Sequence, residues 1–94
     1  MAYILIVGGQ HRAAKQYAEE LMAQAKERGE PVVYRRRSNR FQIGDQKYAF
    51  YGDQPDQIQG WGDGTQVITV VSADISSNTW RRIYAICLHP QEAS

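Results

Sequence analysis

The order of apolar and polar positions along the chain predicts alternating strands and helices. Residues 3–7 form a short, almost entirely apolar and β-branched run that ends at Gly8 and Gly9. A run without alternation is typical of a strand that is covered on both faces. From residue 10 to residue 28, apolar side chains recur at steps of three and four. This period predicts an amphipathic helix, and Gly29 provides its end signal.

The middle of the chain predicts more strands. Residues 32–36 form a second strand that follows the helix, which implies a right-handed parallel crossover from the first. Residues 41–43 and 47–51 flank a Gly-Asp-Gln turn and predict a β-hairpin. The side chains expected on its packed face are Phe41, Ile43, Tyr48 and Phe50.

The second half of the chain predicts a loop, a strand and a helix. Residues 52–65 contain four glycines and three aspartates, so we expect mostly loop, with one helical turn at residues 55–58. Residues 66–71 predict a buried strand beside the first, and residues 79–88 predict the last helix. The expected fold is α/β: a small, mostly parallel sheet with an appended β-hairpin and two helices, in the order β-α-β-β-β-β-α.

Length and composition narrow the class of protein. A chain of 94 residues supports one domain, residues 1–94, and its 43% hydrophobic content is that of a folded protein. No apolar run approaches the roughly 18 residues of a membrane span, and the start of the chain resembles no signal peptide, so we expect a cytoplasmic protein without membrane contact. One cysteine and two histidines leave little material for a metal site, and we expect neither metal nor cofactor.

The first strand-to-helix turn is a candidate anion site. Glycines let backbone N–H groups turn toward an anion, and a helix N-terminus adds a partial positive charge. The candidate ligand-binding residues are Gly8, Gly9, His11, Arg12 and Lys15. The alternative is an ordinary turn in which Lys15 is merely exposed.

The spacing from Gly9 to Lys15 equals that of the phosphate-binding pattern G-x-x-x-x-G-K-[ST]. Two positions depart from it. Ala14 replaces the second glycine, and Gln16 replaces the hydroxyl residue that would bind magnesium. Alanine disfavours the left-handed backbone that glycine adopts, and a glutamine amide is a poor magnesium ligand.

The order of segments resembles the ATPase core of phage terminase large subunits and related P-loop helicase-like enzymes. The segments that carry the resemblance are residues 4–16, 39–52, 55–60 and 66–74. The resemblance implies that Lys15 contacts phosphate and that Asp74 is the nearest acidic residue beyond the third main strand. Residues 70–74 read Val-Val-Ser-Ala-Asp, however, without the paired acids that hold magnesium in that family. The resemblance therefore implies a degenerate, truncated P-loop core, which could have arisen by ancestry or by convergence.

An arginine cluster is the second candidate site. Half of the eight arginines lie between residues 35 and 40, and two tyrosines of the predicted hairpin lie near them. Arginines beside aromatic rings are typical of single-strand nucleic-acid surfaces. The candidate nucleic-acid-binding residues are Arg35, Arg36, Arg37, Arg40, Tyr48 and Tyr51. The alternative is a charged edge strand, because the net charge is only +1 and alternation sends Arg36 to the other face.

These observations favour a small, non-catalytic binding protein, such as a phage or prophage accessory protein. Its expected partner is nucleic acid or a nucleotide, bound through the first turn and the arginine-rich hairpin. A second hypothesis is a regulatory homodimer or protein-binding domain that uses the hairpin edge. A third is a nucleotide hydrolase with an atypical P-loop. No residue set forms a catalytic motif, so we assign no catalytic residue and expect binding rather than an enzyme.

Overall fold

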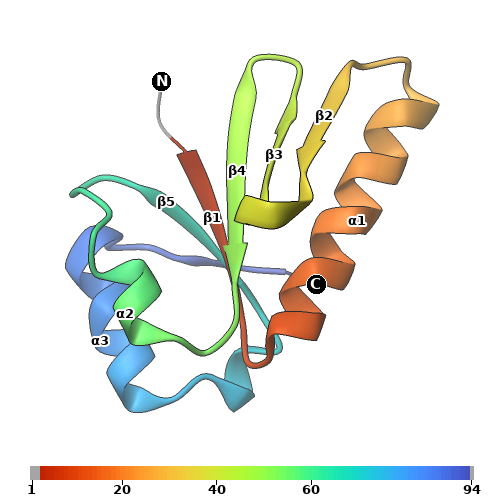
Figure 1. Ribbon diagram of the computed structural model, residues 1–94. Coiled ribbons are helices and arrows are strands. Elements are labelled where there is room, and N and C mark those ends of the chain that lie inside the picture. The colour runs from red at the N-terminus through yellow and green to blue at the C-terminus, as the bar shows by residue number, and fades with distance from the viewer. Residues whose placement is uncertain (1–2, 94) are drawn as a thin grey trace.

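The structure is a computed structural model that describes residues 3–93. A six-stranded sheet lies between the long helix α1 on one face and the shorter helices α2 and α3 on the other (Figure 1). The elements are β1 (Tyr3–Gly8), α1 (His11–Glu27), β2 (Val32–Arg35), η1 (Arg36–Ser38), β3 (Arg40–Ile43), β4 (Gln46–Tyr51), α2 (Pro55–Ile58), β5 (Gln66–Val70), η2 (Ser72–Asp74), α3 (Ser77–Ile86) and β6 (Gln91–Glu92). Among the described residues, no helix combines the length and apolarity that crossing a membrane requires.

The sheet is mixed, which corrects the predicted architecture. Its strand order is β2-β3-β4-β1-β5-β6. Strand β1 pairs in parallel with β4 and β5, and β5 pairs in parallel with β6, whereas β2, β3 and β4 form an antiparallel meander. The predicted hairpin is therefore not appended to the sheet but lies within it, and the order gains helix α2 and strand β6.

The predicted crossover requires β2 to lie beside β1. In the structure β2 lies instead at the edge of the sheet. The reason is burial. Three consecutive residues of β4, Ala49, Phe50 and Tyr51, are buried, so this strand needs cover on both faces and pairs with β1. In β2, Val33 and Arg35 are exposed, so this strand needs cover on one face only and is compatible with an edge position.

The remaining elements agree with the sequence pattern. Strand β5 runs beside β1, as predicted, with register from Ile4↔Gln66 to Gly8↔Val70. Helices α1 and α3 begin and end within two residues of the predicted limits, and α2 forms the predicted helical turn.

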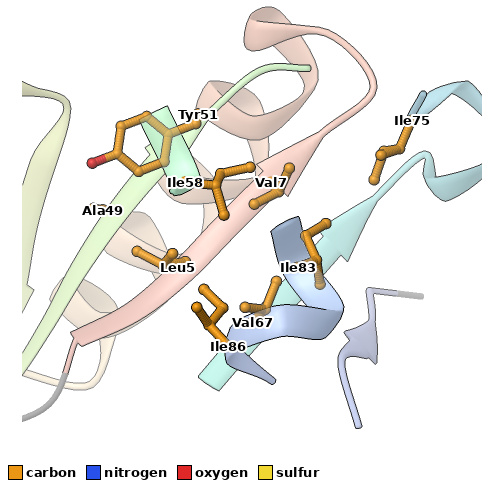
Figure 2. Close-up of a cluster of buried hydrophobic side chains, with 9 residues drawn as sticks. All are labelled: Leu5, Val7, Ala49, Tyr51, Ile58, Val67, Ile75, Ile83 and Ile86. Atoms are coloured by element: carbon orange, nitrogen blue, oxygen red, sulfur yellow. The ribbon is translucent and has the colours of Figure 1, made fainter. Parts of the chain in front are cut away.

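Two hydrophobic clusters fix the layers. Between α1 and the sheet lie Ile6, Ala14, Ala18, Met22, Phe41 and Phe50. The opposite cluster, between the sheet and α2 and α3, is shown in Figure 2 and contains Leu5, Val7, Ala49, Tyr51, Ile58, Val67, Ile75, Ile83 and Ile86. The predicted packed face of the hairpin is confirmed, because Phe41, Ile43, Tyr48 and Phe50 all belong to the α1 side.

Candidate functional site

The turn after β1 is shorter than the phosphate-loop spacing requires. Helix α1 already begins at His11, and the N–H groups of Ala13 and Ala14 donate to the carbonyl oxygen of Gln10 at 3.1 and 3.3 Å. The backbone from His11 to Lys15 is therefore helical and does not form an open loop around a ligand. Lys15 lies in the second helical turn and is exposed.

Neighbouring backbone also closes this turn. A Cβ atom at Gly9 would lie 2.3 Å from Cβ of Asp74, and one at Gly52 would lie 2.6 Å from the backbone nitrogen of His11. Only glycine permits these approaches. Gly52 therefore lies close against the first residue of α1, and an acidic residue lies beside Gly9. Both features oppose the binding of a phosphate at this turn.

The side chains of the first turn lie in different places. The ring of His11 packs against Phe50, with 5.6 Å between centroids, and Arg12 is exposed. Lys15 instead reaches a hollow of about 120 Å³ that also involves the arginine cluster. The residues that line this hollow are Lys15, Glu19, Tyr34, Arg36 and Asn39. Burial, followed by the nearby Glu19 carboxylate, raises the pKa of Tyr34.

The structure divides the arginine cluster between two sides of the sheet. Arg35 and Arg40 are direct partners across β2 and β3 and lie on one face. Arg36 and Arg37 belong to the turn η1 that joins these strands, and the guanidinium of Arg36 lies 5.5 Å from the centroid of Tyr34, on the α1 side. The four arginine side chains therefore do not form a single surface.

Neither predicted tyrosine presents a free ring beside Arg35 and Arg40. Tyr48 stacks on Phe41 on the α1 side, with centroids 4.7 Å apart, and burial raises its pKa. Tyr51 is only 8% exposed and belongs to the core.

Strands β2, β3 and the start of β4 leave a part of the sheet uncovered, which we call the open face. It is a hollow of about 380 Å³ and contains three cationic side chains, and none of the described residues that line it is acidic. Its lining residues are Tyr3, Val33, Arg35, Ser38, Arg40, Phe41, Gln42 and Lys47. Sequence reasoning did not single out Tyr3, Gln42 or Lys47, although the pairings Gln42↔Lys47 and Tyr3↔Lys47 follow from strand alternation once the register is known.

Aromatic rings hold the Arg40 guanidinium in place on the open face. Its central carbon lies 5.3 Å from the centroid of Tyr3 and 5.5 Å from that of Trp61. Burial opposes the charge, but hydrogen bonds with Tyr51 and Tyr3 raise the pKa of Arg40. Lys47 approaches the same Tyr3 ring at 5.9 Å.

A separate polar cluster joins the loop after β4 to the start of α3. A carboxylate oxygen of Asp53 accepts hydrogen bonds from the Ser76 N–H at 3.3 Å, from the Ser76 hydroxyl at 2.9 Å and from the Thr79 hydroxyl. These bonds, that of Thr79 above all, lower the pKa of Asp53. The cluster caps a helix. Within residues 3–93 no group of histidine, cysteine and acidic side chains is arranged to hold a metal ion.

Comparison with known proteins shows similarity of fold. No protein-family model matches the chain, and no curated protein sequence matches it. Among solved structures, the large terminase of a thermophilic bacteriophage is similar, with a TM-score of 0.78 and 19% identity in one crystal form. In another crystal form, in complex with ADP, the values are 0.75 and 18%. The match covers 97% of this chain and 24% of the terminase chain, so this chain has a terminase-like fold and spans about a quarter of that protein.

Proposed function

We propose that this protein is a non-catalytic nucleic-acid-binding protein of phage or prophage origin, and that it binds through Arg35 and Arg40. The observation that carries the proposal is the placement of these two arginines as direct partners on one uncovered face of the sheet. In the part of the chain that the structure describes, neither forms an ion pair with a carboxylate. The terminase-like fold supports the phage origin.

The physical argument is that such a pair is unfavourable without an anion. Like charges directly opposite each other on a sheet destabilise it. A phosphate relieves this repulsion, and the planar guanidinium group donates two parallel hydrogen bonds to phosphate oxygens. The arginine pair therefore stabilises a bound phosphodiester better than a single exposed cation would.

The test is the binding of a fluorescein-labelled 20-nucleotide single strand, measured by fluorescence anisotropy at several salt concentrations. We expect binding at 25 mM NaCl that weakens steeply as salt rises, because each neutralised phosphate releases counterions. The double variant Arg35→Gln/Arg40→Gln should bind much more weakly than the wild type. Lack of binding by the wild-type protein at 25 mM NaCl would refute the proposal.

A second candidate is nucleotide binding at the first turn, through Gly8, Gly9, His11, Arg12 and Lys15. It is supported by the ADP complex of the similar terminase. The closed turn and the adjacent Asp74 oppose it. Titration calorimetry with ADP and Mg²⁺ tests this candidate, and an affinity that disappears in Lys15→Ala would support it. Release of phosphate from ATP that also disappears in this variant would support the hydrolase.

A third candidate is a homodimer or protein complex. Both strands of the predicted hairpin are already paired within the sheet, so their edges are not available, and the edge strands are β2 and the two-residue strand β6. A dimer would therefore pair through β2, the longer of the two. Sedimentation at two protein concentrations tests this candidate, and a sedimentation coefficient that does not change with concentration would refute it.

A further inference from the structure

We infer that a phosphodiester backbone lies across the whole open face, and that Lys47 and Gln42 contact it together with Arg35 and Arg40. This inference rests on the proposed function and extends it, because it names two additional binding residues and the part of the nucleic acid that is recognised. It excludes Arg36 from the main contact, since this side chain lies on the α1 side.

The first argument is the convergence of charge. The register places Arg35, Arg40, Gln42 and Lys47 on one face of three adjacent strands. The cationic groups of Arg40 and Lys47 both lie over the ring of Tyr3, at 5.3 and 5.9 Å from its centroid. No described carboxylate lies within ion-pair distance of either one. Two cations that share one ring without an acidic partner form a favourable site for an anion.

The second argument concerns the form of the ligand. Several phosphates in a row fit a surface on which the cations are distributed over three strands, because β-strands lie about 4.8 Å apart. The side-chain amide of Gln42 already donates to the carbonyl oxygen of Gly44 at 2.9 Å, which holds it within the strand-paired row. Gln42 is paired with Lys47 and lies two residues from Arg40 on the same strand face, so the second N–H of its amide adds a neutral donor to this row.

The third argument is that the bases do not provide the contact. Base stacking requires an aromatic face that is free. On the open face the ring of Tyr3 is occupied by Arg40, Lys47 and the edge contact with Trp61, at 5.0 Å between centroids. Tyr48 lies on the other side of the sheet, and Tyr51 is buried. The open face therefore recognises the backbone and not the sequence.

The first part of the test is the salt dependence of binding to a fluorescein-labelled dT20 strand between 50 and 200 mM NaCl. Three cationic contacts predict a logarithmic slope of about −2, or a loss of about twentyfold in affinity over this range. Lys47→Gln should bring the slope to about −1.4, or a loss of about sevenfold, whereas Lys47→Arg should retain the wild-type slope. Lys26→Gln, an exposed residue near the end of α1, is the matched control and should leave the slope unchanged.

Outcomes for Lys47 and Arg36 separate the inference from the proposed function. If the wild type binds and its slope is lowered by Arg36→Gln but not by Lys47→Gln, the inference is wrong and the proposed function remains. If the wild type does not bind at 25 mM NaCl, both are wrong. Retention of the Lys47→Arg slope shows that the effect of Lys47→Gln comes from charge and not from misfolding.

The second part of the test replaces the bases. A 20-residue strand that consists of abasic deoxyribose phosphates should bind within about threefold of dT20. Base stacking contributes about 1–3 kcal/mol per base in proteins that use it. If stacking were involved here, the abasic strand would therefore bind at least about fivefold more weakly than dT20. A loss of that size would contradict backbone recognition, even if the salt slopes agreed with the inference.

Discussion

Replacement of the half-buried Asp53 by alanine should destabilise the protein more than the same change at the exposed residues Asp56 and Asp63. This carboxylate accepts three hydrogen bonds from the start of α3, from the N–H and hydroxyl of Ser76 and from the hydroxyl of Thr79. It joins the loop that follows β4 to α3, which packs on the face of the sheet that points away from α1.

The magnitude follows from the burial of the donors. Thr79 is completely buried, and a buried hydroxyl that loses its acceptor costs about 1–3 kcal/mol. The contacts with Ser76 are more exposed, so water replaces part of them. The Ser76 hydroxyl, 3.3 Å from that of Thr79, also remains as a partner. We expect a loss of about 2 kcal/mol, which corresponds to a decrease in Tm of about 8–16 °C for a domain of this size.

The lowered pKa of Asp53 gives this contribution a pH dependence. Between the lowered pKa of the folded state and the ordinary pKa of the unfolded chain, the unfolded state binds more protons, so stability rises with pH. The contribution is complete above the ordinary aspartate pKa of about 3.9 and is lost as the pH falls through the folded value. The difference between wild type and Asp53→Asn should therefore be constant near neutral pH and decrease below about pH 4.

Urea denaturation monitored by circular dichroism measures these free energies of unfolding. Asp63→Ala, an exposed loop aspartate, is the control and should change stability by less than about 0.5 kcal/mol. Thr79→Val should destabilise the wild type, yet be close to neutral in the Asp53→Ala background, because the hydroxyl that it removes has already lost its carboxylate acceptor. Equal effects of Thr79→Val in both backgrounds would refute the proposed coupling.

Three further changes test the backbone and the core by the same denaturation assay. Val71 has left-handed dihedral angles, φ 51° and ψ 57°, so Val71→Gly should be about 1 kcal/mol more stable than Val71→Ala, the reverse of the usual order. Gly9→Ala should cost more than about 2 kcal/mol because of the approach of Asp74, whereas Gly60→Ala, which meets nothing within 4 Å, should change stability by less than about 0.5 kcal/mol. Trp61→Ala should cost about 2 kcal/mol, since this half-buried ring packs against the core.

The local elements of the fold were predictable from the sequence, and their order in the sheet was not. Apolar runs and helical periods depend on neighbouring residues, so the strands β1 and β5 and the helices α1 and α3 were located correctly. Strand order depends on pairing between distant segments. Residues 32–34 and residues 49–51 are both runs of three apolar or aromatic residues, so the sequence does not distinguish the edge strand from the central one. The contrast in burial between them appears only in the structure.

The candidate binding surface was predictable in part for the same reason. Arginine content alone singled out Arg35 and Arg40 as candidates, and the turn η1, which the sequence did not predict, separates Arg36 from them. The position of Lys47 on the open face depends on the pairing of β3 with β4, which the turn at Gly44 sets. The same register pairs Arg40 with Ala49 and therefore places Tyr48 on the opposite face. An assignment of Tyr48 to both the packed face and the arginine surface could not hold for a regular strand.

The phosphate-loop spacing from Gly9 to Lys15 shows why a count of residues does not establish a loop. A cradle for phosphate needs backbone that is not helical, so that its N–H groups remain free. Here residues 10–15 read Gln-His-Arg-Ala-Ala-Lys, without a glycine, and alanine is the strongest helix former. The helix therefore extends back to His11, and Ala13 and Ala14 donate to Gln10 instead of to a ligand. Ala14, which stands where the pattern has its second glycine, is thus part of the helix that replaces the loop. Lys15 consequently lies about 6 Å along the helix from its start.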